Sequence, residues 1–157
     1  MKTAIHDTCV TFEEGKLFAL LGQNGAGKST TLKILSGLTP ATFGDALVYG
    51  YSLKSQIHYI REMIGICPQH DILFNELTAT EHIKLYAGLK GVAESDWKMI
   101  IEERLGAVKL LKVANNPVGS FSGGMKRRLS VVIATIGDPK IVFLDGISYF
   151  EWQANNF

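Results

Sequence analysis

The 157-residue sequence predicts an α/β fold with a parallel sheet, and three observations support this prediction. A short apolar run at residues 16–21 stops at a glycine-rich turn, and a helical pattern follows at residues 28–38. Another brief apolar strand is expected at residues 63–69. A third, at residues 141–145, follows a helical stretch at residues 125–137. Strands that alternate with helices in this way are typical of parallel α/β units.

The first half of the chain contains the first unit of that pattern. Residues 16–21 are continuously apolar rather than alternating, which predicts a strand covered on both faces. Three leucines at helical spacing indicate a helix over residues 28–38, and Gly37 marks its end. Residues 43–53 are punctuated by two glycines and predict a hairpin-like pair of strands.

The middle of the chain changes to helical signals. Thr78 and Glu81 have the spacing of a capping box, so a helix is expected from about residue 80 to 89. A second helix is expected from about Ser95. Its apolar stripe consists of Trp97, Ile101, Leu105, Val108 and Leu111. The sequence therefore predicts one α/β domain with a helical insert at roughly residues 71–118.

Charge and composition limit the possible partners. The 16 Lys and Arg residues nearly balance the 15 Asp and Glu residues, so no net field recruits nucleic acid or an anionic membrane surface. We interpret the basic run 126–128 as a solvated helix face. No apolar run reaches the length of a membrane span, so no direct span is expected. Cys9 and Cys67 lie far apart without metal-site spacing, which suits a reducing, cytoplasmic compartment.

The segment "GQNGAGKST" matches the phosphate-binding pattern G-x-x-x-x-G-K-[ST] between a predicted strand and a predicted helix. Its glycines let backbone N–H groups turn toward phosphate oxygens, and the helix N-terminus adds partial positive charge. Lys28 would reach the β and γ phosphates, and the Ser29 hydroxyl would bind Mg²⁺. The expected nucleotide-binding residues are Gly22, Asn24, Gly25, Gly27, Lys28, Ser29 and Thr30. The alternative is a glycine-rich turn with an incidental lysine. The motif predicts a P-loop NTPase, and no Asn-Lys-x-Asp guanine-reading motif accompanies it.

Two further segments resemble a known family. "SFSGGMKRRLSVVIATIGDPKIVFLD" (120–145) resembles the signature motif, the following helix and the Walker B strand of ABC transporter nucleotide-binding domains. "ICPQHDILFNELTATEHIKLYAGLKGV" (66–92) looks like the Q-loop and helical subdomain of the A subfamily, which is associated with lipid transport. The resemblance covers about residues 1–145. It implies an ABC-type ATPase core whose helical subdomain is the insert, with ATP and Mg²⁺ as cofactors.

The resemblance also implies roles for individual residues. Gln69 would touch Mg²⁺ or the attacking water and sense the transmembrane partner, although a loop glutamine is often only solvated. Ser122, Gly123 and Gly124 would face the γ-phosphate bound by a second nucleotide-binding domain in a head-to-tail dimer. Alone, these three residues are an ordinary turn and helix cap. Asp145 would orient Mg²⁺ through water, although an aspartate that ends a strand is often a turn former.

The sequence departs from the family after the Walker B strand. Gly146 stands where the family has the glutamate that polarises the attacking water, and all four histidines precede Asp145, so no candidate for the switch histidine follows. We expect residues 146–157 to be a divergent tail and the C-terminal part of the core to be missing. Three interpretations stay open: an ATPase module at the cytoplasmic face of a lipid-exporting transporter with impaired hydrolysis, a nucleotide-binding regulatory module without turnover, or an incomplete product without an independent role.

Overall fold

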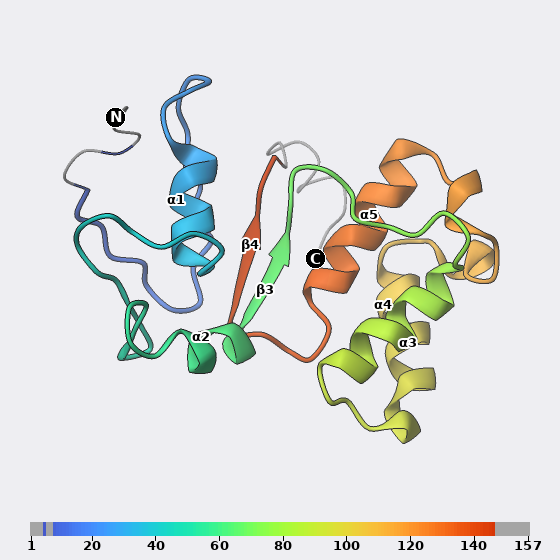
Figure 1. Cartoon of the computed structure of the whole chain (residues 1–157). Coiled ribbons are helices and arrows are strands. Elements are labelled where there is room, and N and C mark those ends of the chain that lie inside the picture. The colour runs from blue at the N-terminus through green and yellow to red at the C-terminus, as the bar shows by residue number, and fades with distance from the viewer. Residues whose placement is uncertain (1–4, 6–7, 147–157) are drawn as a thin grey trace. The chain divides into compact units, whose positions relative to one another are not determined.

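A computed structural model describes residue 5 and residues 8–146 of the chain (Figure 1). The chain divides into two compact units, Met1–Arg61 and Glu62–Phe157. The domain limits expected from the sequence, 1–145 and 146–157, stay a prediction, and the tail from residue 147 lies outside the described residues. Within the described part of the chain, no helix combines the length and the apolarity that crossing a bilayer requires.

The first unit contains a helix and a small hairpin. Helix α1 spans Lys28–Leu35, and strands β1 (Leu47–Val48) and β2 (Tyr51–Ser52) pair antiparallel. The two residues between these strands, Tyr49 and Gly50, have φ of 48° and 84°. Positive φ at both central residues is the mark of the tight turn whose twist matches a hairpin. The predicted helix and hairpin are therefore confirmed. Helix α2 (Ile57–Met63) begins in this unit.

The predicted strand at residues 16–21 is wrong. The segment has no strand assignment, and Leu17 and Leu21 are 64% and 88% exposed rather than covered. A strand exists only where a neighbouring strand supplies backbone hydrogen bonds, and an apolar run cannot supply them itself. Within the described residues, β1 and β2 pair with each other and neither pairs with this segment.

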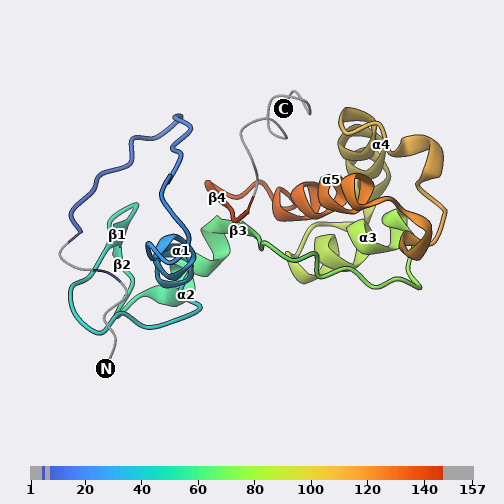
Figure 2. The same ribbon diagram turned by 90° about the horizontal axis from the view of Figure 1, so that it is seen from above.

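The second unit is built on two parallel strands. Strands β3 (Ile64–Cys67) and β4 (Ile141–Leu144) lie within the two segments that the sequence predicted to be strands. The structure shows that they pair in parallel, from Ile64↔Ile141 to Cys67↔Leu144. Helix α5 (Gly123–Ala134) packs against β3. Helices α3 (Ala79–Leu89) and α4 (Trp97–Ala107) pack beside α5 (Figure 2) and are the two helices expected in the insert. Short 3-10 turns lie at 94–96, 111–113 and 118–120.

Helix α3 begins at the predicted capping box. The Thr78 hydroxyl accepts a bond from the Glu81 N–H, and the Glu81 carboxylate accepts one from the Thr78 N–H at 2.8 Å. The Thr78 hydroxyl also donates to the Glu81 carboxylate at 2.9 Å, and the two bonds that this carboxylate accepts from Thr78 lower the pKa of Glu81. Buried His82 accepts a bond from the Phe74 N–H at 3.0 Å, while its other ring nitrogen lies 2.8 Å from the Thr78 carbonyl. The helix start and the loop before it therefore form one hydrogen-bonded structure.

The main core of this unit lies between the three helices. Its buried residues are Ala79, Ile83, Ala87, Ile101, Leu105, Val108, Leu110, Ala114, Val118, Phe121, Leu129, Val132 and Ile136. The predicted apolar stripe is confirmed at its centre, where Ile101, Leu105 and Val108 are buried. Leu111 departs from it, because α4 ends at Ala107 and Leu111 lies in the next 3-10 turn, 45% exposed.

Gly65 lets β3 approach the end of α5. A Cβ at this position would lie 1.8 Å from the Ala134 carbonyl oxygen and 3.1 Å from Pro139 Cγ. The first of these atoms is backbone, so no rotamer change could relieve the contact. Close packing of β3 on α5 therefore depends on the absence of a side chain at residue 65.

We expect Gly65→Ala to lower the free energy of unfolding by roughly 1–3 kcal/mol or more, because it overpacks a backbone contact. The measurement is urea denaturation of the whole chain. Gly106→Ala is the control: a Cβ there meets nothing within 4 Å and lies inside α4, so it should raise stability by up to about 1 kcal/mol. Equal stability of the two variants would contradict this account of β3 packing.

Candidate functional site

The predicted phosphate-binding loop is a glycine turn that runs directly into α1 (Figure 1). Gly25 and Gly27 have φ of 86° and 91°, a conformation that side chains disfavour. The Ala26 N–H donates to the Gln23 carbonyl at 3.1 Å and closes the turn. Gly27 is the N-cap of α1, and no side chain of the described residues caps that helix. Its first turn therefore presents backbone N–H groups to a ligand.

Lys28 is folded back over the same loop. Its ammonium donates to the Gly22 carbonyl at 2.7 Å and to the Gln23 carbonyl at 2.9 Å. These bonds are exposed, so phosphate oxygens could replace the two carbonyls as acceptors. The first turn of α1 contains no acidic residue that would repel phosphate. The loop thus concentrates N–H groups and one positive charge at a single place.

The other predicted residues of the loop lie in the same stretch. Asn24 is exposed in the turn beside Gly25, while Ser29 and Thr30 are half-buried in the first turn of α1. The helix is further anchored one residue later, where the Thr31 hydroxyl donates to the Gly27 carbonyl at 3.1 Å. All seven residues predicted from the motif therefore belong to one loop and the helix start that follows it.

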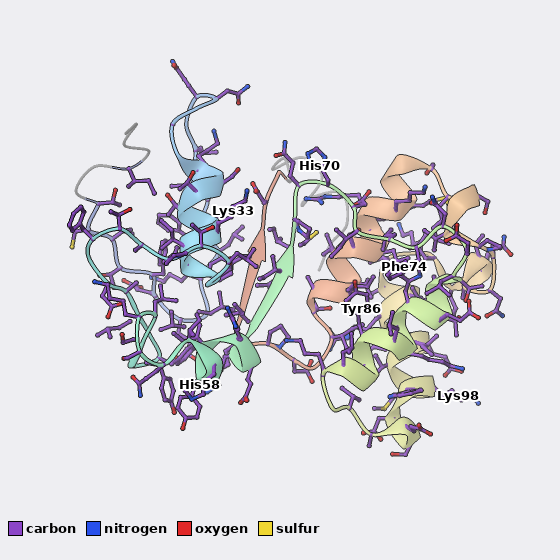
Figure 3. All side chains as sticks on the ribbon, in the orientation of Figure 1. Lys33, His58, His70, Phe74, Tyr86 and Lys98 are labelled. Carbon is purple, nitrogen blue, oxygen red and sulfur yellow. The ribbon has the colours of Figure 1, made fainter. Side chains whose placement is uncertain are left out.

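The second unit brings Gln69 and Asp145 to the carboxyl ends of neighbouring strands. Asp145 directly follows β4, and its N–H donates to the Cys67 carbonyl at 2.9 Å. Gln69 is two residues beyond the end of β3, in an exposed bend next to His70 (Figure 3). Parallel pairing makes these two ends coincide at one edge of the sheet. This edge is the usual place of ligand sites in parallel α/β sheets.

Gly146 fits closely against Gln69. Its φ is 70°, and a Cβ at this position would lie 2.7 Å from Gln69 Cγ and 3.2 Å from Gln69 Cβ. The glutamine side chain therefore lies where any side chain at residue 146 would begin. A glutamate placed here would need both a strained backbone and a shift of Gln69.

The signature residues form the start of α5. Ser122 is the N-cap, and its hydroxyl accepts a bond from the Met125 N–H at 3.3 Å. Gly123 and Gly124 are the first two helical residues; both are exposed, and a Cβ on either would meet nothing within 4 Å. Ser122 therefore caps α5, which is one of the two roles that the sequence left open for these residues. The same glycines leave the N-terminus of a 12-residue helix open to an approaching ligand.

Arg127 is a site residue that the sequence interpretation missed. We read the run 126–128 as solvated, yet the Arg127 side chain is only 14% exposed. Its two terminal nitrogens donate to the Pro68 carbonyl and to the Asp145 carbonyl, each at 2.5 Å. The helical period of α5 could have indicated that Arg127 lies on the buried face of the helix. Residues 130, 131 and 134 follow Arg127 at three, four and seven residues, and all of them are buried.

Cys67 is buried beside this arginine. Burial raises the pKa of its thiol to about 11, with a smaller opposing effect from Arg127. The thiolate is the reactive form of cysteine, so the structure predicts an inert thiol. Within the described residues, no group of three or more His, Cys, Asp or Glu side chains could hold a metal ion by itself.

Comparisons with known proteins agree with this geometry. The chain matches the family model described as ABC transporter over residues 5–147. It is 50% identical over 144 residues to "ABC transporter A family member 2" of Arabidopsis thaliana and 49% identical over 142 residues to "ABC transporter A family member 1" of Dictyostelium discoideum, in both cases over 90% of this chain. The human "ATP-binding cassette sub-family A member 2" is 43% identical over 142 residues. The chain spans 15%, 16% and 6% of the length of these relatives, respectively.

Solved structures share the fold. The chain resembles an ATP-binding subunit of an ABC transporter with a TM-score of 0.72 and 29% identity, over 86% of this chain and 58% of that one. It also resembles a dimeric ATP-binding cassette in a post-hydrolysis state bound to ADP and phosphate, with a TM-score of 0.78 and 24% identity, over 92% and 68% of the two chains. The fold is that of a P-loop NTPase, of the ABC ATPase type. The chain belongs to the ABC transporter family.

Thiol labelling tests the burial of β3. At pH 8 we expect a thiol reagent to modify exposed Cys9 in the native chain but not Cys67, of which about one molecule in a thousand is thiolate at a pKa of about 11. Both should react in urea. Cys9→Ser is the control and should show no native labelling. Native labelling of Cys67 at the rate of Cys9 would contradict the buried position.

Proposed function

We propose that this chain binds Mg-ATP as the ATP-binding module of an ABC transporter of the A subfamily. The observation that carries the proposal is the loop at 22–30, in which Lys28 and the open helix start converge. Four backbone N–H groups at a helix start and one ammonium suit a polyphosphate, which carries several negative oxygens. The A-family relatives support the choice of subfamily.

Mg²⁺ fits the residues that would meet it. Magnesium prefers oxygen ligands and is normally bound by one or two carboxylates together with substrate phosphates. Ser29, Gln69 and Asp145 offer a hydroxyl, an amide oxygen and a carboxylate, and no all-protein cage exists among the described residues. When bound, the metal would neutralise phosphate charge. In this proposal, Lys28 of the first unit would hold the phosphates, and Gln69 and Asp145 of the second unit would offer oxygen atoms to the metal.

Gly146 supports slow hydrolysis. Phosphoryl transfer depends on positioning and charge stabilisation, and a residue that orients the attacking water is one of its components. At residue 146 this chain has no side chain, and Gln69 lies against the space where one would begin. Loss of a general base typically lowers a rate 10²- to 10⁴-fold, so we infer ATP binding with little turnover.

The remaining parts of the proposal concern partners. The open start of α5 at Ser122–Gly124 supports a contact with the γ-phosphate held by a second nucleotide-binding domain. We further propose that the module acts at the cytoplasmic face of a membrane with transmembrane domains, and that the transported substrate is a lipid. The proposal of a lipid substrate rests on the A-subfamily resemblance alone.

We expect Lys28→Ala to weaken ATP binding at least 10-fold, because it removes the only side-chain charge expected on the phosphates. Binding of a fluorescent ATP analogue measures the effect. Lys33→Ala is a matched control, because Lys33 is an exposed lysine on the same helix (Figure 3). If both variants bind ATP as the unchanged chain does, the loop is not a nucleotide site.

We expect the purified chain to release phosphate from ATP 10²- to 10⁴-fold more slowly than an ABC domain that carries the glutamate. A phosphate-release assay measures this, with Lys28→Ala as the background. Turnover at the rate of such a domain would refute impaired hydrolysis and favour an active ATPase module. Binding without turnover would fit a regulatory module equally well.

A further inference from the structure

We propose that Arg127 is a positioning residue, which sets the spacing between Gln69 and Asp145 and thereby the affinity of these two residues for Mg²⁺. The inference rests on the proposed function, because Mg²⁺ binding at these two residues is part of it. It adds a residue outside the phosphate-binding loop, the Q-loop, the signature and the Walker B strand. Arg127 itself touches neither metal nor nucleotide in this proposal and acts through backbone carbonyls.

The geometry of the guanidinium supports this role. One terminal nitrogen donates to the carbonyl of Pro68, the residue immediately before Gln69, and the other donates to the carbonyl of Asp145 itself. A single rigid plane thus connects the residues that follow β3 and β4, beyond the last ladder pair, Cys67↔Leu144. A further hydrogen bond joins the same two segments, from the Asp145 N–H to the Cys67 carbonyl at 2.9 Å.

A second set of contacts fixes the arginine. The Asp71 carboxylate lies 3.7 Å from an Arg127 nitrogen, and the same carboxylate oxygen accepts a 2.8 Å bond from the Ser130 hydroxyl. Ser130 follows Arg127 by three residues on α5, so both side chains lie on one face of that helix. Asp71 is itself two residues after Gln69. The loop that carries Gln69 is therefore held on both sides by one helix.

The end of this loop is attached to α5 as well. Lys126 donates from its ammonium to the Asn75 side-chain carbonyl at 3.1 Å. Residues 68–75 therefore contact α5 at Pro68, Asp71 and Asn75. The Lys126 contact is exposed, whereas the Arg127 side chain is nearly buried, so most of the constraint comes from the arginine.

Lysine cannot replace the arginine in this arrangement. Guanidinium presents several N–H donors in one fixed plane, whereas ammonium is a point charge on a flexible stem. Arg127→Lys therefore retains the positive charge and most of the packing but does not hold both carbonyls at a fixed spacing. The Arg127→Lys variant therefore distinguishes an effect of positioning from an effect of charge. Because the Arg127 side chain is nearly buried, this variant also disturbs packing less than truncation of the side chain would.

The test measures binding of a fluorescent ATP analogue to the full chain in EDTA and then across a Mg²⁺ titration. For Arg127→Lys and Arg127→Met we expect near-normal binding in EDTA, because the phosphate-binding loop is unchanged. We expect the half-saturating Mg²⁺ concentration to rise about 10- to 100-fold, the usual effect of losing a residue that orients metal ligands. Ser130→Ala, which frees Asp71, should shift it in the same direction by a smaller factor.

Arg128→Met is the matched control. It removes the same charge from the next residue of α5, and the Arg128 side chain makes no hydrogen bond or ion pair with the residues that the structure describes. Its Mg²⁺ titration should match that of the unchanged chain. Protection of Cys67 from thiol reagents checks that each variant is folded, and if Arg127→Met is not, Arg127→Lys and Ser130→Ala decide the result.

Two outcomes would overturn the inference about Arg127 while leaving the proposed function intact. One is an unchanged Mg²⁺ half-saturation in Arg127→Lys and Ser130→Ala. The other is an equal loss of binding in EDTA and in Mg²⁺, which would make Arg127 a general structural residue. Failure of the unchanged chain to bind the analogue in either condition would refute the proposed function itself, and this inference with it.

Discussion

The parallel pairing of β3 with β4 is the constraint on which the second unit depends. It brings the ends of two segments that are more than 70 residues apart in the sequence to one edge, so that Gln69 and Asp145 become neighbours. The pairing is possible because Gly65 carries no side chain where β3 meets the Ala134 carbonyl. Helix α5 then packs on β3 and supplies Arg127 to the strand ends. A missing Cβ thus permits the approach that the polar contacts stabilise.

The first unit uses glycine differently. Gly25 and Gly27 adopt positive φ, which turns the chain sharply before α1 and leaves the N-terminal N–H groups of that helix uncapped. Lys28 bonds to carbonyls of its own loop, so its charge is already held beside those groups. Such pre-organisation lowers the entropy that binding a polyphosphate would cost. The conformation of this loop is therefore fixed mainly by residues within the loop and the start of α1.

Gly146 combines a positive φ with a close side-chain contact. Its positive φ and its contact with Gln69 belong to one local arrangement, in which the glutamine side chain lies against the backbone after Asp145. Residue 146 has no side chain that could orient water, which supports our proposal of ATP binding with little turnover. Binding and hydrolysis depend on different atoms, so the loss of one need not abolish the other.

Local signals determined most of the predicted elements. The phosphate-binding motif, the Thr78–Glu81 capping box, the hairpin within residues 43–53 and the two apolar strands β3 and β4 each depend on residues close in sequence, and the structure contains all of them. The signature cap at Ser122 belongs with these. Such features follow from backbone conformation and short-range hydrogen bonds, which a sequence specifies directly.

Only the tertiary structure decided the features that need a distant partner. The apolar run at residues 16–21 resembles a strand, yet pairing depends on another segment, and the described residues supply none. Arg127 looks like part of a solvated basic run, yet its partners lie 59 and 18 residues away. The contact of Gln69 with Gly146 is equally invisible in the sequence. Sequence patterns record what a residue prefers locally, whereas burial and bonding of these side chains depend on which surfaces folding brings together.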